Sequence, residues 1–358
     1  MNSYPLHDSV FTITPYVRQR VDPSILNLRS CELIHPRITE ILTAFKHDAM
    51  QLQFYPYPQE TLERIAQHWK IPVTQLIVSA GSDAIISVIL DALGTVTGRL
   101  ILQTPNYFGW HDYAQLRGLR VTTVSLGQPY ARMFHMNTLL TCVRAHAASL
   151  VVISNPNSPT GFVFTPTEVR SLAFACAKAG HLLVIDECFA QFAALDHYEI
   201  LGPQPHIIYV RSCSKSLGLA GMRVAITIAS ERITQYLARW RPDASVSGPA
   251  LYFLLKLLIT QKTAIQEIQQ DIIRSREKFI QALKQIRVDW EVLPSGGNYV
   301  VVYLGNSSDD PTYVTDFLYK RGYAIRDISK LPGLEACVRF GIAHWPVMTL
   351  ILDILKEL

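Results

Sequence analysis

The chain has 358 residues, of which 49% are hydrophobic, and 33 basic against 29 acidic side chains give a formal net charge of +4. This length is sufficient for a large core and favours one large and one smaller domain. The positive charge is weak and scattered, which excludes a nucleic-acid arm, and no apolar run is long enough to span a membrane.

The N-terminal residues and the cysteines indicate the compartment in which the protein works. Residues 1–8 contain no basic stretch followed by an apolar run, so they do not resemble a signal peptide. The six cysteines are widely spaced and form no Cys-x-x-Cys pair, which is typical of buried thiols in a reducing compartment. We therefore expect a cytoplasmic protein without a metal site.

Short β-rich runs alternate with helical patterns in the middle of the chain. Strands are predicted at residues 76–79, 100–103, 121–125, 150–154, 182–186, 207–210 and 224–228. Several of these runs are apolar throughout, as expected for strands buried on both faces. Pro166 begins a helical pattern that Gly180 ends. This alternation predicts an α/β fold with a mainly parallel sheet that helices cover on both faces.

The pattern changes towards the C-terminus. Long helical stretches rich in Gln, Lys and Glu occupy residues 251–258 and 265–286, and short strands and helices follow from residue 299 onwards. This α+β pattern predicts a second, smaller domain. We expect an N-terminal segment at residues 1–45 that packs with the small domain, a large domain at residues 46–240 and the small domain at residues 241–358.

The stretch from Ser212 to Arg223 contains the residue types that hold a phosphate-bearing aldehyde. Lys215 can form a Schiff base with the aldehyde. Ser212 and Ser214 can donate hydrogen bonds to phosphate oxygens, and the planar guanidinium of Arg223 can bind the same dianion. Most lysines are solvated surface charges. However, the strand-like run at residues 206–210 precedes this stretch and places Lys215 at the end of a buried strand.

Three other polar segments follow predicted strands, at the edge where α/β sheets build their sites. An irregular loop rich in Asn and Pro contains Asn157 and Ser158, either of which can bond a ligand oxygen; an ordinary turn is the alternative. Asp186 ends an apolar strand, where its carboxylate needs a partner such as a protonated pyridine nitrogen, unless it caps a helix. Ser82 and Asp83 begin a helix whose free N–H groups favour a phosphate, although the pattern also fits a simple N-cap.

Together and in this order, these segments resemble fold-type-I pyridoxal-phosphate enzymes of the class I/II aminotransferase family. Within that family the chain is similar to the histidinol-phosphate aminotransferase branch, which also contains threonine-phosphate decarboxylase. The resemblance extends from about Tyr55 to Arg339, and the Ser-x-Ser-Lys…Gly-x-Arg and Pro-Thr-Gly elements are its specific parts.

The resemblance implies a role for each residue at the pyridoxal 5'-phosphate site. Lys215 would form the Schiff base and carry the proton between Cα and the cofactor, and Asp186 would pair with the pyridine nitrogen. Tyr107 matches the aromatic residue that stacks on the ring, with a core tyrosine as the alternative. The phosphate cup would consist of Ser82, Asp83, Ser212, Ser214 and Arg223.

The resemblance also implies residues for the substrate and for a partner subunit. Tyr55 matches a tyrosine that reaches the phosphate in the other subunit, which implies a homodimer with shared sites. Arg339 matches the arginine that grips a substrate α-carboxylate, and Asn298 matches a residue beside the substrate. Arg326 matches a basic residue near the distal end of the substrate, although a surface arginine is an equal alternative.

The chain departs from the family pattern near the phenolic oxygen of the cofactor. Ser158 stands where relatives have an asparagine directly before Pro-Thr-Gly, with Asn157 one residue earlier, and Phe189 replaces a tyrosine that donates a hydroxyl. Loss of a donor favours the protonated Schiff base and raises its pKa, unless Phe189 is a variation with little effect. The N-terminal run is also unusual, and its Glu32 either faces a cationic substrate or is a solvated carboxylate.

Three functions fit this sequence. The first is transamination of an α-amino acid or amino phosphate. The second keeps the cofactor but performs decarboxylation, elimination, or cyclisation and oxidation of an arginine-like amino acid. The third is a binding module without catalysis, against which the complete set of Lys215, Asp186, Arg223 and Arg339 argues. No nucleic-acid or membrane partner is expected.

Overall fold

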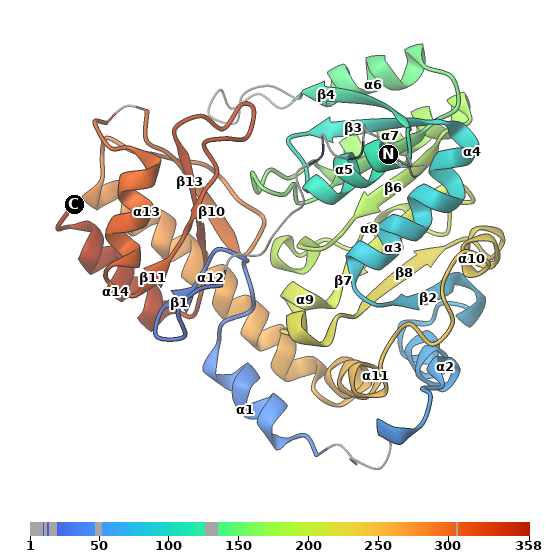
Figure 1. Ribbon diagram of the computed structural model, residues 1–358, viewed down its shortest axis with the longest axis horizontal. Coiled ribbons are helices and arrows are strands. Elements are labelled where there is room, and N and C mark those ends of the chain that lie inside the picture. Colours follow the sequence, from blue (N-terminus) through green and yellow to red (C-terminus); the bar gives the residue numbers. More distant parts are fainter. Residues whose placement is uncertain (1–9, 11–12, 14–19, 47–51, 126–134, 306) are drawn as a thin grey trace, which may run out of the picture.

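The computed structural model describes residues 10, 13, 20–46, 52–125, 135–305 and 307–358. The helices are α1 (Pro36–Ala44), α2 (Pro58–Trp69), α3 (Ser82–Ile89), α4 (Thr95–Thr97), α5 (Phe108–Leu116), α6 (Met136–Ala145), α7 (Pro166–Ala179), α8 (His197–Leu201), α9 (Cys213–Ser216), α10 (Glu231–Ala238), α11 (Gly248–Leu255), α12 (Lys262–Ile286), α13 (Pro311–Tyr319) and α14 (Trp345–Leu355). The strands are β1 (Leu26–Asn27), β2 (Leu76–Ser79), β3 (Arg99–Thr104), β4 (Arg120–Ser125), β5 (Leu150–Ser154), β6 (Leu182–Asp186), β7 (Ile207–Ser212), β8 (Ala225–Ala229), β9 (Glu291–Val292), β10 (Tyr299–Tyr303), β11 (Tyr323–Ala324), β12 (Arg326–Asp327) and β13 (Cys337–Gly341). Figure 1 shows a large body around one long sheet and a smaller body beside it, with α12 extending between them.

The large body is built on a seven-stranded sheet in the order β2-β8-β7-β6-β5-β3-β4. Neighbouring strands from β7 to β4 pair in parallel, whereas β8 runs antiparallel to both of its neighbours. Every residue of β5 is buried, as its unbroken apolar sequence predicts for a strand covered on both faces. The predicted α/β class and the mainly parallel sheet are therefore confirmed, and each predicted strand has its counterpart.

Helix α7 shows how the local sequence sets the limits of an element. Thr165 and Glu168 form a capping box, in which the backbone N–H of each residue donates to the side chain of the other. Pro166 occupies the first turn, and Gly180 ends the helix in the left-handed conformation at φ 73°. The predicted helix is therefore confirmed with its start and its end.

The order of the parallel strands brings three polar segments to one edge of the sheet. β6 lies between β5 and β7, and Asp186 at its end pairs in register with Ser154 at the end of β5. β7 leads directly into α9, which carries Lys215. Ser212 caps α9 by accepting a hydrogen bond from the Ser214 backbone N–H at 3.3 Å. Segments far apart in the sequence therefore meet at the carboxyl ends of these strands.

The smaller body contains a four-stranded antiparallel sheet in the order β12-β13-β10-β9. β1 of the N-terminal segment pairs in parallel with β11, so the described part of that segment contacts this body. The boundaries at residues 46 and 241 remain predictions. Residues 1–9, 11–12 and 14–19 of the predicted N-terminal segment lie outside the described residues.

Helix α12 ties the two bodies together through a buried arginine. Arg276 Nη1 donates to the backbone oxygen of Gly297, just before β10, at 2.8 Å and to that of Phe192, just after β6 and its following turn, at 3.1 Å. A buried guanidinium needs such acceptors, and each carbonyl is fixed in return. The start of β10 is therefore held against the large body.

Candidate active site

A cavity of about 510 Å³ opens at the shared edge of β5, β6 and β7 and reaches the small body. Most of the predicted site residues line it, namely Ser82, Asp83, Tyr107, Ser158, Asp186, Ser212, Ser214, Lys215, Arg223, Arg326 and Arg339. They come from seven different segments of the chain, so only the fold brings them together. This cavity is therefore the candidate active site.

Lys215 presents a half-buried amine to this cavity. It lies on α9, and its Nζ donates to the backbone oxygen of Ser30 from the N-terminal segment. Burial lowers the pKa of Lys215 because the charged form loses hydration, and Cys31 and Glu32 oppose this effect only in part. A larger fraction of the amine is therefore neutral, which is the form that attacks an aldehyde.

Asp186 is a buried carboxylate that accepts hydrogen bonds but has no cationic partner among the described residues. Trp110 Nε1 donates to its Oδ2 and the Cys188 backbone N–H to its Oδ1, each at 3.1 Å. Burial raises the pKa of Asp186, and these hydrogen bonds act in the opposite direction. A cationic group in the cavity would compensate the buried charge, and a protonated pyridine nitrogen is such a group.

The start of α3 and the Arg223 side chain form a pocket suited to a phosphate. Gly81 precedes α3 at φ 83°, and a Cβ there would lie 2.7 Å from Arg223 Nη2, so the close approach requires glycine. Arg223 Nη2 donates to Asp83 Oδ2 at 3.1 Å, and Tyr107 Oη donates to Asp83 Oδ1 at 2.7 Å. Asp83 therefore orients both the basic group and the aromatic ring, while the N–H groups in the first turn of α3 are suited to bind an anion.

Arg339 and Arg326 form a second cationic region at the other end of the cavity. They are directly opposite each other in the antiparallel pairing of β13 and β12, so their side chains project from the same face of the sheet. Arg339 is 5% exposed, and its Nη2 donates to the Arg29 backbone oxygen at 2.8 Å. Its buried Nε has no hydrogen-bond partner among the described residues, so it is available to a ligand.

Four predicted site residues do not line the cavity. Asn157 Nδ2 donates to the Pro105 backbone oxygen at 2.8 Å and its Oδ1 accepts from the Thr160 hydroxyl at 2.6 Å, so the amide links its own loop to the loop after β3. Asn298 Nδ2 donates to the Cys31 backbone oxygen at 2.8 Å. Glu32 is half-buried beside Lys215, and Tyr55 is 82% exposed on the surface.

The cavity also contains residues that the sequence did not reveal, among them Ser30, Cys31, Phe108, Ser154, Pro156, Cys188 and Ala220. Cys188 directly follows Asp186 and Glu187 in the sequence, and this position next to a predicted site residue could have indicated that it lines the cavity. Ser30 and Cys31 belong to a segment without a recognisable motif, and it reaches the site only because β1 pairs with β11.

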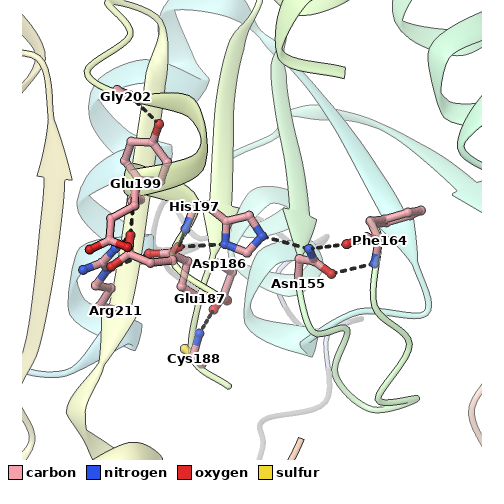
Figure 2. Close-up of polar contacts among 11 residues, drawn as sticks. Asn155, Phe164, Asp186, Glu187, Cys188, His197, Glu199, Gly202 and Arg211 are labelled. Carbon is pink, nitrogen blue, oxygen red and sulfur yellow. Dashed lines mark hydrogen bonds and ion pairs between the residues drawn. The ribbon is translucent and has the colours of Figure 1, made fainter. Parts of the chain in front are cut away.

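A buried polar network lies behind the catalytic edge and is drawn in Figure 2. Glu187 follows Asp186 but lies outside the cavity lining, since successive strand residues point to opposite faces. Its Oε2 accepts from Arg211 Nε at 2.6 Å, and its Oε1 is 2.7 Å from His197 Nδ1. Burial acts to raise the pKa of Glu187, but Arg211 and His197 outweigh it and lower the pKa to about 2.

Hydrogen bonding within this network orients the side chains of Asn155 and His197. Asn155 Oδ1 accepts from the Phe164 N–H at 2.8 Å, and its Nδ2 donates to the Phe164 oxygen at 3.1 Å. The same Nδ2 lies 2.8 Å from His197 Nε2, which must therefore accept. The proton on His197 Nδ1 is directed at Glu187. Asn155 in turn holds both ends of the loop that contains Ser158.

Comparison with known proteins identifies this arrangement. The fold and the lysine–carboxylate–arginine site define a fold-type-I pyridoxal-phosphate enzyme. The family model for aminotransferase class I and II matches residues 23–350, so the chain belongs to this family. Its cofactor is pyridoxal 5'-phosphate, and the half-buried Lys215 amine, the unpaired Asp186 carboxylate and the pocket beside Arg223 fit this group.

Individual relatives are distant but match most of the chain. A histidinol-phosphate aminotransferase of Thermoanaerobacter pseudethanolicus is 27% identical over 96% of this chain and 93% of its own length. The structure of histidinol-phosphate aminotransferase from Sinorhizobium meliloti in complex with pyridoxal-5'-phosphate has a TM-score of 0.81, with 22% identity over 99% of this chain and 98% of that one. The structure of L-threonine-O-3-phosphate decarboxylase from Porphyromonas gingivalis has a TM-score of 0.74, with 18% identity over 93% of this chain and 99% of that one. These solved structures share the fold. No helix in the described part of the chain has the length and apolar character needed to cross a membrane.

The lowered pKa of Lys215 predicts how cofactor attachment depends on pH. The rate at which the apoprotein takes up pyridoxal 5'-phosphate covalently rises with pH and levels off once the amine is neutral. Because burial lowers the pKa, we expect the midpoint below the ordinary lysine value of 10.5. Stopped-flow absorbance measures the rate, and Lys215→Ala supplies the background from other lysines. A midpoint at or above 10.5 would contradict this assignment.

The buried network predicts an acid-sensitive contribution to stability. The surroundings of Glu187 lower its pKa from 4.5 to about 2. Its contribution to stability is therefore complete above pH 4.5 and is lost as the pH falls towards 2. We expect Glu187→Gln to lower the free energy of unfolding by roughly 3 kcal/mol near neutral pH, since Arg211 loses its buried partner. Urea denaturation of the apoprotein measures this loss, which should shrink as pH falls through that window. Glu199→Gln, at an exposed carboxylate on α8, is the control, and an equal loss in both variants would refute the role of Glu187.

Proposed function

We propose that the protein is an aminotransferase for an amine that carries a strongly anionic group, in the chemical class of L-histidinol phosphate. The observation that carries this proposal is the cross-strand pair of Arg326 and Arg339 on the cavity wall. Two adjacent guanidinium groups match the charge of a phosphate dianion, whereas one suffices for a carboxylate. The names of the relatives support the same class.

Lys215 and Asp186 have different roles in the reaction of the amino group. When bound, pyridoxal 5'-phosphate supplies an aldehyde that takes up the amine and a ring that accepts electrons. The Lys215 amine is the nucleophile that holds the aldehyde and, once displaced, the base that removes the proton from the substrate Cα. Asp186 keeps a proton on the ring nitrogen, because a buried carboxylate gains most from a cation in contact.

The remaining residues orient the reactants. Arg223, Ser214 and the N-terminus of α3 hold the cofactor phosphate, and Ser82, Asp83 and Ser212 complete this cup. Tyr107, held by its hydrogen bond to Asp83, would stack on the face of the cofactor ring. Asn298 supports the substrate side by fixing the backbone at Cys31. Glu32 raises the pKa of Lys215 from its place beside the amine, in the opposite direction to burial.

A homodimer with shared sites is the second part of the proposal. Tyr55 is 82% exposed, and its neighbours Phe54 and Tyr57 are 69% and 82% exposed. Such a run of exposed aromatic side chains favours a protein interface. In the homodimer, Tyr55 reaches the cofactor phosphate of the partner subunit. The six free cysteines support a reducing, cytoplasmic compartment.

The arginine pair predicts a substrate-dependent effect of one substitution. We expect Arg326→Gln to raise KM for an amino phosphate about tenfold or more, since a charged hydrogen bond is lost, and to change KM for a monocarboxylate amino acid much less. Steady-state kinetics of the holoenzyme with a keto-acid acceptor measure this, with product analysis by mass spectrometry. Arg321→Gln, at a half-exposed arginine of the same body, is the control. Equal effects on both substrates would contradict the phosphate assignment, and acceptor-independent release of carbon dioxide would indicate decarboxylation instead.

Shared sites predict complementation between two inactive variants. Lys215→Ala and Tyr55→Ala homodimers should each have low activity. When they are mixed, unfolded and refolded together, half of the dimers are hybrids, and each hybrid has one intact site. We expect about a quarter of wild-type activity in the mixture. Activity no higher than the mean of the two homodimers would show that Tyr55 acts within its own subunit or not at all.

A further inference from the structure

Trp110 connects the first turn of α5 with the buried carboxylate of Asp186. It is fully buried, and its backbone N–H donates to the Tyr107 oxygen at 3.2 Å within that turn. Its indole Nε1 donates to Asp186 Oδ2 at 3.1 Å. Trp110 does not line the cavity, whereas Tyr107 and Asp186 both do. One turn of helix therefore presents an aromatic ring to the cavity and an N–H group to the carboxylate.

The turn before α5 is anchored beside Asp186, so the indole is held in a defined position. Ser154, which pairs in register with Asp186, donates from its hydroxyl to Asn106 Oδ1 at 2.5 Å. The Tyr107 backbone N–H donates to the same amide oxygen at 2.7 Å. The indole itself packs in the apolar core together with residues of α3. The end of β5 and this core therefore fix the N–H group against the carboxylate.

The chemistry of the indole determines what this hydrogen bond can do. An indole N–H group donates and cannot accept, so Trp110 cannot take up a proton from Asp186. A donor stabilises an ionised carboxylate more than a neutral carboxylic acid, since charge-assisted hydrogen bonds are the stronger ones. Burial raises the pKa of Asp186, and the bond from Trp110 acts in the opposite direction. Trp110 therefore favours the form of Asp186 that carries no proton.

We propose that Trp110 is a positioning residue that keeps the proton between Asp186 and the cofactor on the ring nitrogen. This inference rests on the role of Asp186 given above and extends it to a residue outside the cavity lining. One proton lies between the carboxylate and the ring nitrogen, and it resides on the more basic of the two. Without the indole donor the carboxylate becomes more basic, so the proton moves towards its oxygen. A ring nitrogen without the proton accepts electrons less readily, which slows proton removal from the substrate Cα.

The test is the NMR resonance of the ring nitrogen in the holoenzyme, reconstituted with ¹⁵N-labelled pyridoxal 5'-phosphate and measured near neutral pH without substrate. Trp110→Phe removes the donor and keeps an aromatic ring in the core. We expect the ratio of nitrogen-bound to oxygen-bound proton to fall about tenfold, as for the loss of one charge-assisted hydrogen bond. The resonance of Trp110→Phe should therefore lie between those of the wild type and of Asp186→Asn.

A matched control separates the loss of this hydrogen bond from a general loss of packing. Trp290 is also a buried tryptophan whose Nε1 donates to an aspartate, in this case to Asp309 Oδ2 at 2.8 Å. It lies in the small body, directly before β9, and does not line the cavity. Trp290→Phe should lose a similar amount of stability in urea denaturation and leave the ring-nitrogen resonance at the wild-type value.

A second variant decides the question should Trp110→Phe fail to fold. Replacement of Trp110 by benzothienylalanine keeps the two-ring shape but has sulfur in place of the N–H group, so it should move the resonance in the same direction. A wild-type resonance in the folded variant, or an equal shift in Trp290→Phe, would refute the proposal. An unprotonated nitrogen in the wild type would refute the role of Asp186 and the proposal with it. No substrate is present, so a negative result with Arg326→Gln leaves this test unaffected.

Discussion

The buried carboxylate of Asp186 is the constraint on which the site depends. It ends the central strand of a parallel sheet, its hydrogen-bond donors are neutral, and burial raises its pKa. These hydrogen bonds offset the burial of the charge only in part, and a cation placed in the cavity before it would compensate the rest. The strand order then sets Lys215 on one flank and Ser158 on the other. The protonated ring of pyridoxal phosphate would satisfy this requirement, with the Lys215 amine placed to hold its aldehyde.

Asp186 and Glu187 are adjacent carboxylates at the end of β6, but their surroundings give them different roles. Asp186 lines the cavity and its pKa is raised, whereas Glu187 lies among Arg211 and His197 and its pKa is lowered. The alternation of strand residues places them on opposite faces. Glu187 therefore stabilises the strand ends from behind, and Asp186 remains available to the cofactor.

Much of this arrangement is predictable from the sequence, because it depends on local patterns. Apolar runs predict the parallel strands, and the small and hydroxyl residues around Lys215 predict a turn at the end of a strand that lines the cavity. The direction in which a loop side chain points is not local information. Asn157 and Ser158 are neighbours in sequence, yet the Asn157 amide bonds Pro105 and Thr160, whereas Ser158 lines the cavity. Ser30 and Cys31 reach the cavity only through the pairing of β1 with β11.

The central claim is that Asp186 holds a proton on the ring nitrogen of the bound cofactor. Reconstitution of the apoprotein with pyridoxal 5'-phosphate labelled with ¹⁵N in the ring allows the protonation state of this nitrogen to be measured directly by NMR. The account predicts a protonated nitrogen in the wild type near neutral pH and an unprotonated one in Asp186→Asn with the cofactor still bound. An unprotonated nitrogen in the wild type, or a protonated one in both proteins, would contradict it.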